Sequence, residues 1–161
     1  MKKLLAFCLA LPMAVLGQSL DGVNPEHLAA YPSQPSLKAR EIKRISLKTG
    51  VELEYVEQGG RAGVPLVLLH GLSDSWRSFQ SVLPHFPHSI RAFAISQRGH
   101  GDSQRPATGY ATPDFAADIA AFVEQLQLGP VIIVGHSMGG VNAQQFAIDY
   151  PRLVKALVII D

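Results

Sequence analysis

Cysteine is nearly absent from this 161-residue sequence, whose one cysteine, Cys8, lies in an apolar run close to the N-terminus. A disulfide framework needs paired cysteines, so a disulfide-stabilised scaffold is excluded, and cysteine chemistry is excluded as well if Cys8 is removed with the N-terminal run. An excess of one charge is also absent, because 14 basic side chains stand against 13 acidic ones and leave a formal net charge of +1. Without a dense Lys/Arg cluster beyond the N-terminus, this balance predicts no nucleic-acid partner.

The composition is that of an ordinary globular protein. Hydrophobic residues make up 47% of the chain and charged residues 17%, which differs from the composition of disordered or fibrous proteins. The length allows one domain with a sizeable core, and the sequence has no internal repeat. A packed single domain is therefore expected.

The first residues have the layout of a secretory signal peptide. Lys2 and Lys3 precede the apolar run 4–17, and a polar segment follows from Gln18. A membrane anchor is the alternative, but the run is shorter than the roughly 20 apolar residues that a spanning helix needs. We therefore predict a signal peptide over residues 1–17, whose removal also removes the cysteine, and a secreted or periplasmic protein with no membrane association afterwards.

Residues 18–40 are expected to form an extended lead-in, because they contain three prolines and no sustained hydrophobic period. The part that follows, residues 41–161, begins with alternating polar and apolar residues over 41–47 and again over 51–56. The turn signal Lys48-Thr49-Gly50 lies between these two segments. An antiparallel β-hairpin is therefore predicted.

Beyond this hairpin, short apolar runs rich in Val, Ile and Leu alternate with helical patterns. The runs are typical of strands buried on both faces. They cover residues 66–69, 90–95, 131–134 and 156–160. This alternation predicts an α/β fold: a doubly wound, mostly parallel sheet with helices on both faces and an N-terminal antiparallel hairpin.

Three helices are expected between the strands. Asp74 is a candidate cap for the first helix, which ends at Pro84. Thr112 is the candidate N-cap of the second helix, with a proline at the first helical position. The third helix follows Ser137 and ends at about Tyr150, just before a proline.

The strongest chemical signal is the run Gly135-His136-Ser137-Met138-Gly139-Gly140. It follows the predicted strand 131–134 and opens a predicted helix, which is the context of the G-x-S-x-G nucleophile elbow. A serine on that turn presents its hydroxyl above the sheet, while the elbow glycines Gly135 and Gly139 let strand and helix approach closely. Ser137 is therefore the predicted nucleophile. A glycine-rich helix entry without chemistry is the alternative.

A second motif, His70 to Trp76, directly follows the predicted strand 66–69. In an acyl-transfer site the tetrahedral oxyanion needs two fixed N–H donors, and the backbone amides of Leu72 and Met138 are the candidates. The alternative is that His70-Gly71 only turns the chain.

A third motif, Gln97 to Ser103, contains paired glycines that indicate a tight loop at the same end of the sheet. His100 and Asp102 are a conceivable base and acid. Two residues so close in sequence on one loop rarely fill both roles. We therefore interpret this motif as structural.

Together the three motifs resemble the α/β-hydrolase fold superfamily, in the branch of haloperoxidase-like esterases, epoxide hydrolases and ring-cleavage-product hydrolases. The resemblance covers about residues 41–161 and implies that fold, oxyanion amides at Leu72 and Met138, and a small-molecule substrate without a cofactor. Epoxide hydrolases and dehalogenases of this branch use an aspartate nucleophile. Serine at position 137 instead implies an acyl-enzyme formed on an ester, thioester, amide or carbon–carbon bond next to a carbonyl.

The resemblance also implies a catalytic triad in the order serine, acid, histidine, with the acid usually after the seventh strand and the histidine after the eighth. The sequence ends at the predicted sixth strand, so the chain is expected to be an N-terminal portion that lacks the histidine and is nearly inactive alone. Asp161, at the end of that strand, is a candidate acid. His85 and His88 have no evident third metal ligand, so no metal site is predicted.

The leading hypothesis is a serine hydrolase that acts on small or medium carboxylic esters through an acyl-enzyme at Ser137. A cofactor-free perhydrolase, in which peroxide replaces water, is one alternative. A non-catalytic ligand-binding protein on the same fold is another, and an interaction protein with an accidental G-x-S-x-G motif is a third.

Overall fold

The computed structural model of the chain describes residues 41–161. The predicted signal peptide, the predicted lead-in and Cys8 lie outside the described residues. Within residues 41–161, no helix is both long enough and apolar enough to cross a membrane.

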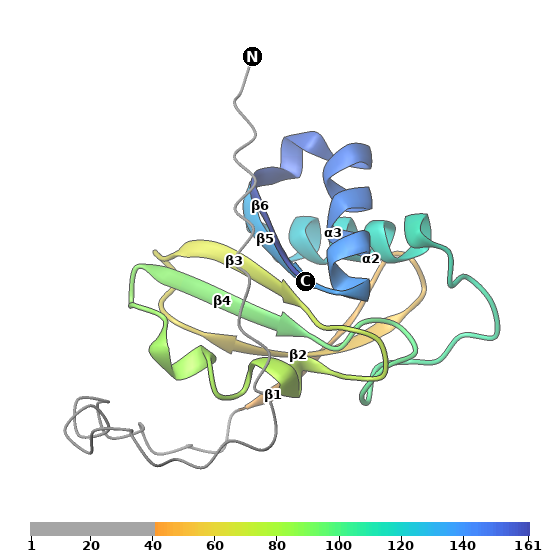
Figure 1. Cartoon of the computed structure of the whole chain (residues 1–161), viewed down its shortest axis with the longest axis horizontal. Helices are drawn as coiled ribbons and strands as arrows, with labels where there is room; N and C mark the ends of the chain where they lie inside the picture. Colours follow the sequence, from red (N-terminus) through yellow and green to blue (C-terminus); the bar gives the residue numbers. More distant parts are fainter. Residues whose placement is uncertain (1–40) are drawn as a thin grey trace, which may run out of the picture.

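Six strands form one sheet in the order β1-β2-β4-β3-β5-β6 (Figure 1). The strands are β1 (Ile42–Ser46), β2 (Glu52–Gln58), β3 (Val64–Leu69), β4 (Ile90–Ile95), β5 (Val131–His136) and β6 (Val154–Ile160). β1 pairs antiparallel with β2, and β2 pairs antiparallel with β4. The remaining pairs, β4 with β3, β3 with β5 and β5 with β6, are parallel. The predicted hairpin and the predicted parallel sheet are confirmed.

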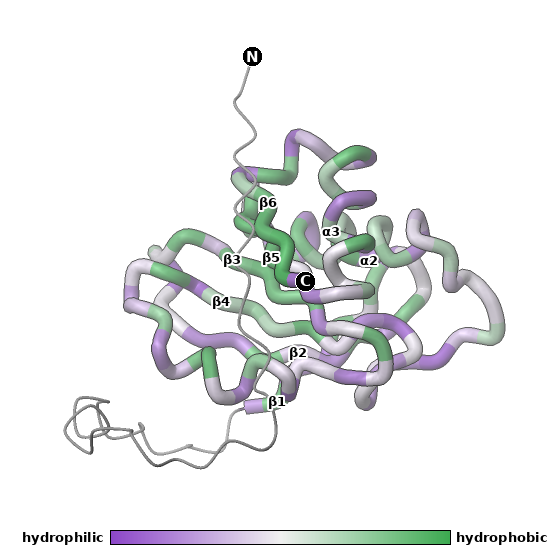
Figure 2. The backbone as a smooth tube through the Cα atoms, viewed as in Figure 1, coloured by the Kyte–Doolittle hydropathy of each residue, from purple (hydrophilic) through white to green (hydrophobic). Residues whose placement is uncertain are grey.

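Both α-helices of the described part, α2 (Thr112–Gln125) and α3 (Met138–Asp149), cover the same face of the sheet (Figure 1). The core beneath them contains Phe93 of β4 and Phe122 of α2, whose rings meet edge to face with centroids 5.7 Å apart. Such aromatic pairs add to the stabilisation from burial alone. Figure 2 shows that β5 and β6 are apolar over most of their length. β5 lies between β3 and β6 and is largely buried, as expected for an inner parallel strand, whereas β6 is at the edge of the described sheet and is only partly buried.

Two short 3-10 helices, η1 (Trp76–Phe79) and η2 (Leu83–His85), pack against the opposite face. The prediction of one continuous helix capped by Asp74 is therefore wrong. Asp74 accepts a hydrogen bond from the adjacent Ser75 N–H at 2.8 Å and interacts with the Ser78 side chain, while the Ser75 hydroxyl caps η1. Pro84 has no N–H and would clash with the preceding turn of a continuous α-helix, so the segment forms single turns that still bury its large apolar side chains.

α2 begins one residue earlier than predicted. Ala111 is its N-cap and Thr112 its first helical residue. The carboxylate of Asp114 accepts a hydrogen bond from the Ala111 N–H at 2.9 Å, so a side chain in the first turn satisfies the backbone and an N-cap hydroxyl is not required. α3 begins directly after Ser137 and ends just before Tyr150, as predicted.

Candidate active site

Ser137 lies on the turn between β5 and α3. Its backbone has φ 49° and ψ −116°, a conformation that costs a residue with a side chain about 1–3 kcal/mol. Its N–H donates to the carbonyl oxygen of Ile160 at 3.0 Å, which attaches the turn to the end of β6. Ser137 is exposed, so the strained turn presents its hydroxyl at the carboxyl end of the sheet, above the unpaired N–H groups that begin α3.

The backbones around this turn approach so closely that two positions admit only glycine. A Cβ on Gly135 would lie 2.2 Å from the carbonyl oxygen of Gly139. A Cβ on Gly139 would lie 2.3 Å from the carbonyl oxygen of Leu69. α3 therefore starts directly against the ends of both β5 and β3, and Met138 lies beside the loop that follows β3.

That loop carries Leu72 to the other side of Ser137. A Cβ built on Gly71 would lie 3.5 Å from the Cβ of Ser137, so the loop and the elbow are in contact. Leu72 and Met138 line the same surface pocket, which has a volume of about 360 Å³. The pocket is completed by His100, Tyr110, Thr112, Phe115, Val141 and Asn142. The two residues predicted as oxyanion donors are thus brought together beside the predicted nucleophile.

The buried ring of His70 orients the peptide that carries the Leu72 N–H. Its Nδ1 donates to the carbonyl oxygen of Gly71 at 2.7 Å, and its Nε2 accepts from the Gln97 N–H at 3.0 Å. These two partners fix the neutral tautomer with the proton on Nδ1. Because the Gly71 carbonyl and the Leu72 N–H belong to one planar peptide, holding the carbonyl holds the N–H in the opposite direction. This role of the His70 side chain was not predicted from the sequence.

Protonation of His70 should weaken the fold below neutral pH. Burial lowers the pKa of the His70 imidazole, and although the hydrogen bond to Gly71 opposes this, the nearby His100 lowers the pKa further. The unfolded chain, with a histidine pKa of about 6.5, then binds more protons than the folded one. Stability is fully present above about pH 6.5 and falls as the pH decreases toward the lower folded pKa.

Thermal unfolding of the complete gene product between pH 5 and pH 8 measures this effect. In a His70→Leu variant the melting temperature should be lower throughout but should change less with pH than in the parent. Parallel pH profiles for the two proteins would contradict the assignment.

The loop formed by residues 97–103 is held by buried polar contacts, as its structural interpretation requires. Glu54 of β2 is buried, and its backbone N–H donates to the Ser103 hydroxyl oxygen at 2.8 Å. Arg98 binds the Asp118 carboxylate of α2 with two hydrogen bonds, of 2.7 Å from Nε and 2.6 Å from Nη2. Bidentate pairs of this kind are strong and fix geometry. The loop is thereby joined to β2 on one side and to α2 on the other.

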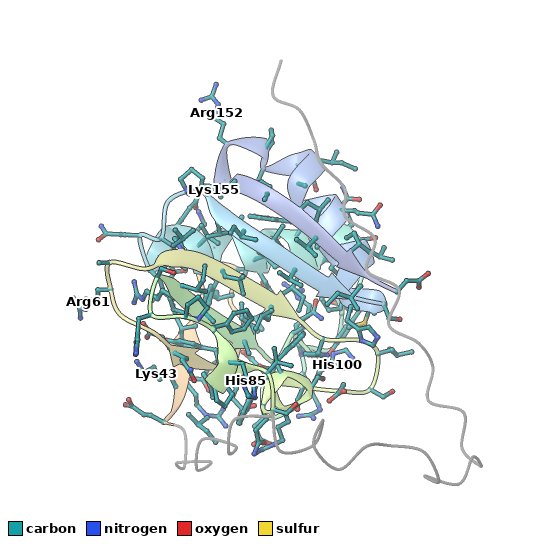
Figure 3. The ribbon with its side chains drawn as sticks, turned by 60° about the vertical axis from the view of Figure 1, so that its left-hand side comes forward. Lys43, Arg61, His85, His100, Arg152 and Lys155 are labelled. Atoms are coloured by element: carbon teal, nitrogen blue, oxygen red, sulfur yellow. The ribbon has the colours of Figure 1, made fainter. Side chains whose placement is uncertain are left out.

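None of the described histidines hydrogen-bonds to the Ser137 side chain within residues 41–161. His100 packs its ring against His70 with centroids 5.2 Å apart and lies beside the loop that follows β3 (Figure 3). His85 comes from η2, and both His85 and His88 are exposed. In the described part of the chain no three metal-ligating side chains gather at one place.

Asp161, the candidate acid, is exposed and directly follows β6. The residue before it, Ile160, accepts the hydrogen bond from the Ser137 N–H. The carboxylate is therefore at the same end of the sheet as the elbow, on the strand next to β5. Its assignment as the acid stays a prediction.

Comparison with known proteins agrees with this architecture. A family model described as alpha/beta hydrolase fold matches residues 64–161. The chain is 36% identical over 111 residues to 2-(acetamidomethylene)succinate hydrolase of Mesorhizobium japonicum, which covers 69% of this chain and 39% of that protein. It is 38% identical over 112 residues to the soluble epoxide hydrolase of Corynebacterium sp. strain C12, which covers 70% of this chain and 38% of that protein.

Among solved structures, Cfl2 wild type from Burkholderia cenocepacia superimposes with a TM-score of 0.73 at 34% sequence identity, covering 79% of this chain and 43% of that chain. The chain thus belongs to the α/β-hydrolase fold family. It spans 39% and 38% of the lengths of the two curated relatives named above.

Proposed function

We propose that this chain belongs to an exported serine hydrolase that cleaves small or medium carboxylic esters through an acyl-enzyme at Ser137. One observation carries the proposal: Leu72 and Met138 line one pocket directly beside an exposed serine held on a strained strand-to-helix turn. Two backbone N–H donors next to a nucleophilic hydroxyl are the arrangement that acyl transfer requires. The proposed export rests on the predicted signal peptide, residues 1–17. A mature protein whose N-terminus lies within residues 1–17 would contradict it.

In the proposed reaction the Ser137 Oγ attacks the ester carbonyl carbon and its proton passes to a general base. The carbonyl oxygen becomes an oxyanion that accepts hydrogen bonds from the Leu72 and Met138 amides. Collapse of the tetrahedral intermediate expels the alcohol, which takes the proton, and leaves Ser137 acylated. Water then attacks the acyl-enzyme by the same route and releases the acid. The base in this proposal is a histidine outside residues 41–161.

Serine at the elbow also separates this proposal from epoxide opening. A serine alkoxide that attacks an epoxide would form an ether, which water cannot cleave by carbonyl addition, whereas an acyl-serine ester is readily hydrolysed. The pocket favours an apolar substrate group, since Tyr110, Phe115 and Val141 contribute to its wall together with Leu72. Such a lining stabilises a substrate mainly by burial of apolar surface.

A burst experiment tests the proposal. The complete product of the gene that encodes this chain is mixed rapidly with p-nitrophenyl butyrate, and p-nitrophenol release is followed from the first milliseconds. An acyl-enzyme predicts release of up to one equivalent per active site before the steady rate, wherever deacylation is the slower step. If deacylation is too fast for a burst to be seen, trapping of the acyl group with hydroxylamine detects the acyl-enzyme instead. Absence of both burst and trapped acyl group would favour a non-catalytic ligand-binding protein on the same fold.

A further inference from the structure

Gln97 connects the two elements that carry the proposed oxyanion donors. Its side chain is buried, with 3% of its surface exposed, and so is that of Asn142, with 2%. The Gln97 Nε2 donates to the carbonyl oxygen of His70 at 2.9 Å. The Gln97 Oε1 accepts from the Nδ2 of Asn142 at 2.8 Å. One buried amide thus joins the end of β3 to the second turn of α3.

Gln97 holds His70 at two points. The side-chain amide binds the His70 carbonyl, while the backbone N–H of Gln97 binds the His70 ring at Nε2. The His70 ring in turn binds the Gly71 carbonyl, whose peptide carries the Leu72 N–H. The position of Gln97 therefore determines how that peptide is placed.

The same series of hydrogen bonds also reaches the second proposed donor, the Met138 amide, through Asn142. Asn142 is rigidly attached to Met138 because both belong to α3. The hydrogen bond from Asn142 to Gln97 consequently fixes the position of α3 relative to the loop that follows β3. Two N–H donors bind one oxyanion well only when their separation is fixed to a fraction of an ångström.

We propose that Gln97 is a positioning residue that fixes the Leu72 and Met138 amides relative to each other, an inference that rests on the proposed serine-hydrolase function. The role requires a side chain that donates to one neighbour and accepts from another. A carboxylate lacks the donor, methionine has neither group, and asparagine is shorter by one methylene. Gln97 itself does not line the pocket beside Ser137, so it acts through the amides.

The experiment measures phosphonylation of Ser137 by a fluorophosphonate in the complete gene product, at several probe concentrations. This reaction places developing negative charge in the same oxyanion position and does not depend on the natural substrate. For Gln97→Met we expect the limiting rate of phosphonylation to fall roughly 10- to 100-fold. The concentration giving half the limiting rate should change less than about threefold, because the pocket wall is intact and the donors act mainly in the transition state.

Glu57→Gln serves as the control. It weakens the partly buried ion pairs of the Glu57 carboxylate with Lys43, at 2.9 Å, and with Arg91, at 2.6 Å. Arg91 is near the start of β4, at the opposite end of that strand from Gln97. The control should lower the melting temperature while the phosphonylation rate stays within about twofold of the parent. A purely structural role for Gln97 predicts that Gln97→Met behaves in the same way, and that result would overturn the inference while the proposed function stands.

Asn142→Leu tests the same inference if Gln97→Met does not fold. The inference predicts a slower limiting rate for Asn142→Leu as well. Asn142 also lines the pocket, so where the double variant folds, its loss should be clearly smaller than the two single losses combined, since both variants break one connection. An unchanged limiting rate in folded Asn142→Leu would contradict the inference. Failure of the parent protein to react at Ser137 is a different outcome, because it would remove the proposed function and the inference with it.

Discussion

Replacing Ser137 with alanine is expected to reduce ester turnover by about a millionfold, which is the loss found when the nucleophile of a serine hydrolase is removed. The oxyanion donors and the pocket remain in this variant, so a residual rate of about a thousandfold over water is expected from binding and oxyanion stabilisation alone. Steady-state hydrolysis of p-nitrophenyl butyrate by the complete gene product measures the change. Turnover within tenfold of the parent would show that another residue is the nucleophile.

Ser137→Gly is the informative companion to this variant, because it separates the chemistry from the backbone strain. Both variants lack the hydroxyl and should be equally inactive. Ser137 has φ 49°, which a glycine adopts without a Cβ clash. The free energy of unfolding of Ser137→Gly should therefore exceed that of Ser137→Ala by about 1 kcal/mol, after the greater entropy of glycine in the unfolded chain is subtracted from the strain. Equal stabilities would argue against strain at the elbow.

Replacing Gly139 with alanine should cause a large loss of stability. The added Cβ would lie 2.3 Å from the carbonyl oxygen of Leu69 and 2.6 Å from that of His70. Both obstacles are backbone atoms of a central strand and its loop, so neither can move without disturbing the sheet. We expect a destabilisation of about 3 kcal/mol or more, together with loss of activity, because α3 and Met138 must move away from Leu72.

Gly60→Ala is the matched control. A Cβ at Gly60 would have no heavy atom within 4 Å, and Gly60 is not one of the described glycines with a positive φ. The same chemical change should leave the stability within about 1 kcal/mol of the parent, or raise it by restricting the unfolded chain. Denaturant unfolding of both variants measures the difference. Equal effects at the two positions would contradict the close packing of α3 against β3.

The strands were predictable because a strand that is buried on both faces is a short, continuous apolar run in the sequence. The apolar run 90–95 coincides with β4, and the elbow serine was identifiable because its strand, glycines and helix are contiguous in sequence. The segment after Asp74 was predicted less well. Its apolar spacing fits a helix, but prolines remove the N–H donors that a continuous helix needs, and packing against the sheet then selects two short 3-10 turns.

The supporting polar contacts were not predictable, because they join residues that are distant in sequence. The hydrogen bond between Gln97 and Asn142 spans 45 positions, and neither residue belongs to a recognisable motif for that contact. The ring of His70 was noted only as part of a His-Gly turn. Its tautomer depends on a backbone N–H from another strand's loop, which only the folded chain brings into range.

Mass spectrometry after fluorophosphonate treatment identifies the nucleophile itself. The complete gene product is treated with the probe, digested, and the peptide that contains Ser137 is sequenced by fragmentation. We expect one phosphonyl group per molecule, located on Ser137, and none in Ser137→Ala. An unmodified Ser137 in folded protein, or a modification that persists in the alanine variant, would contradict the assignment of Ser137 as the nucleophile.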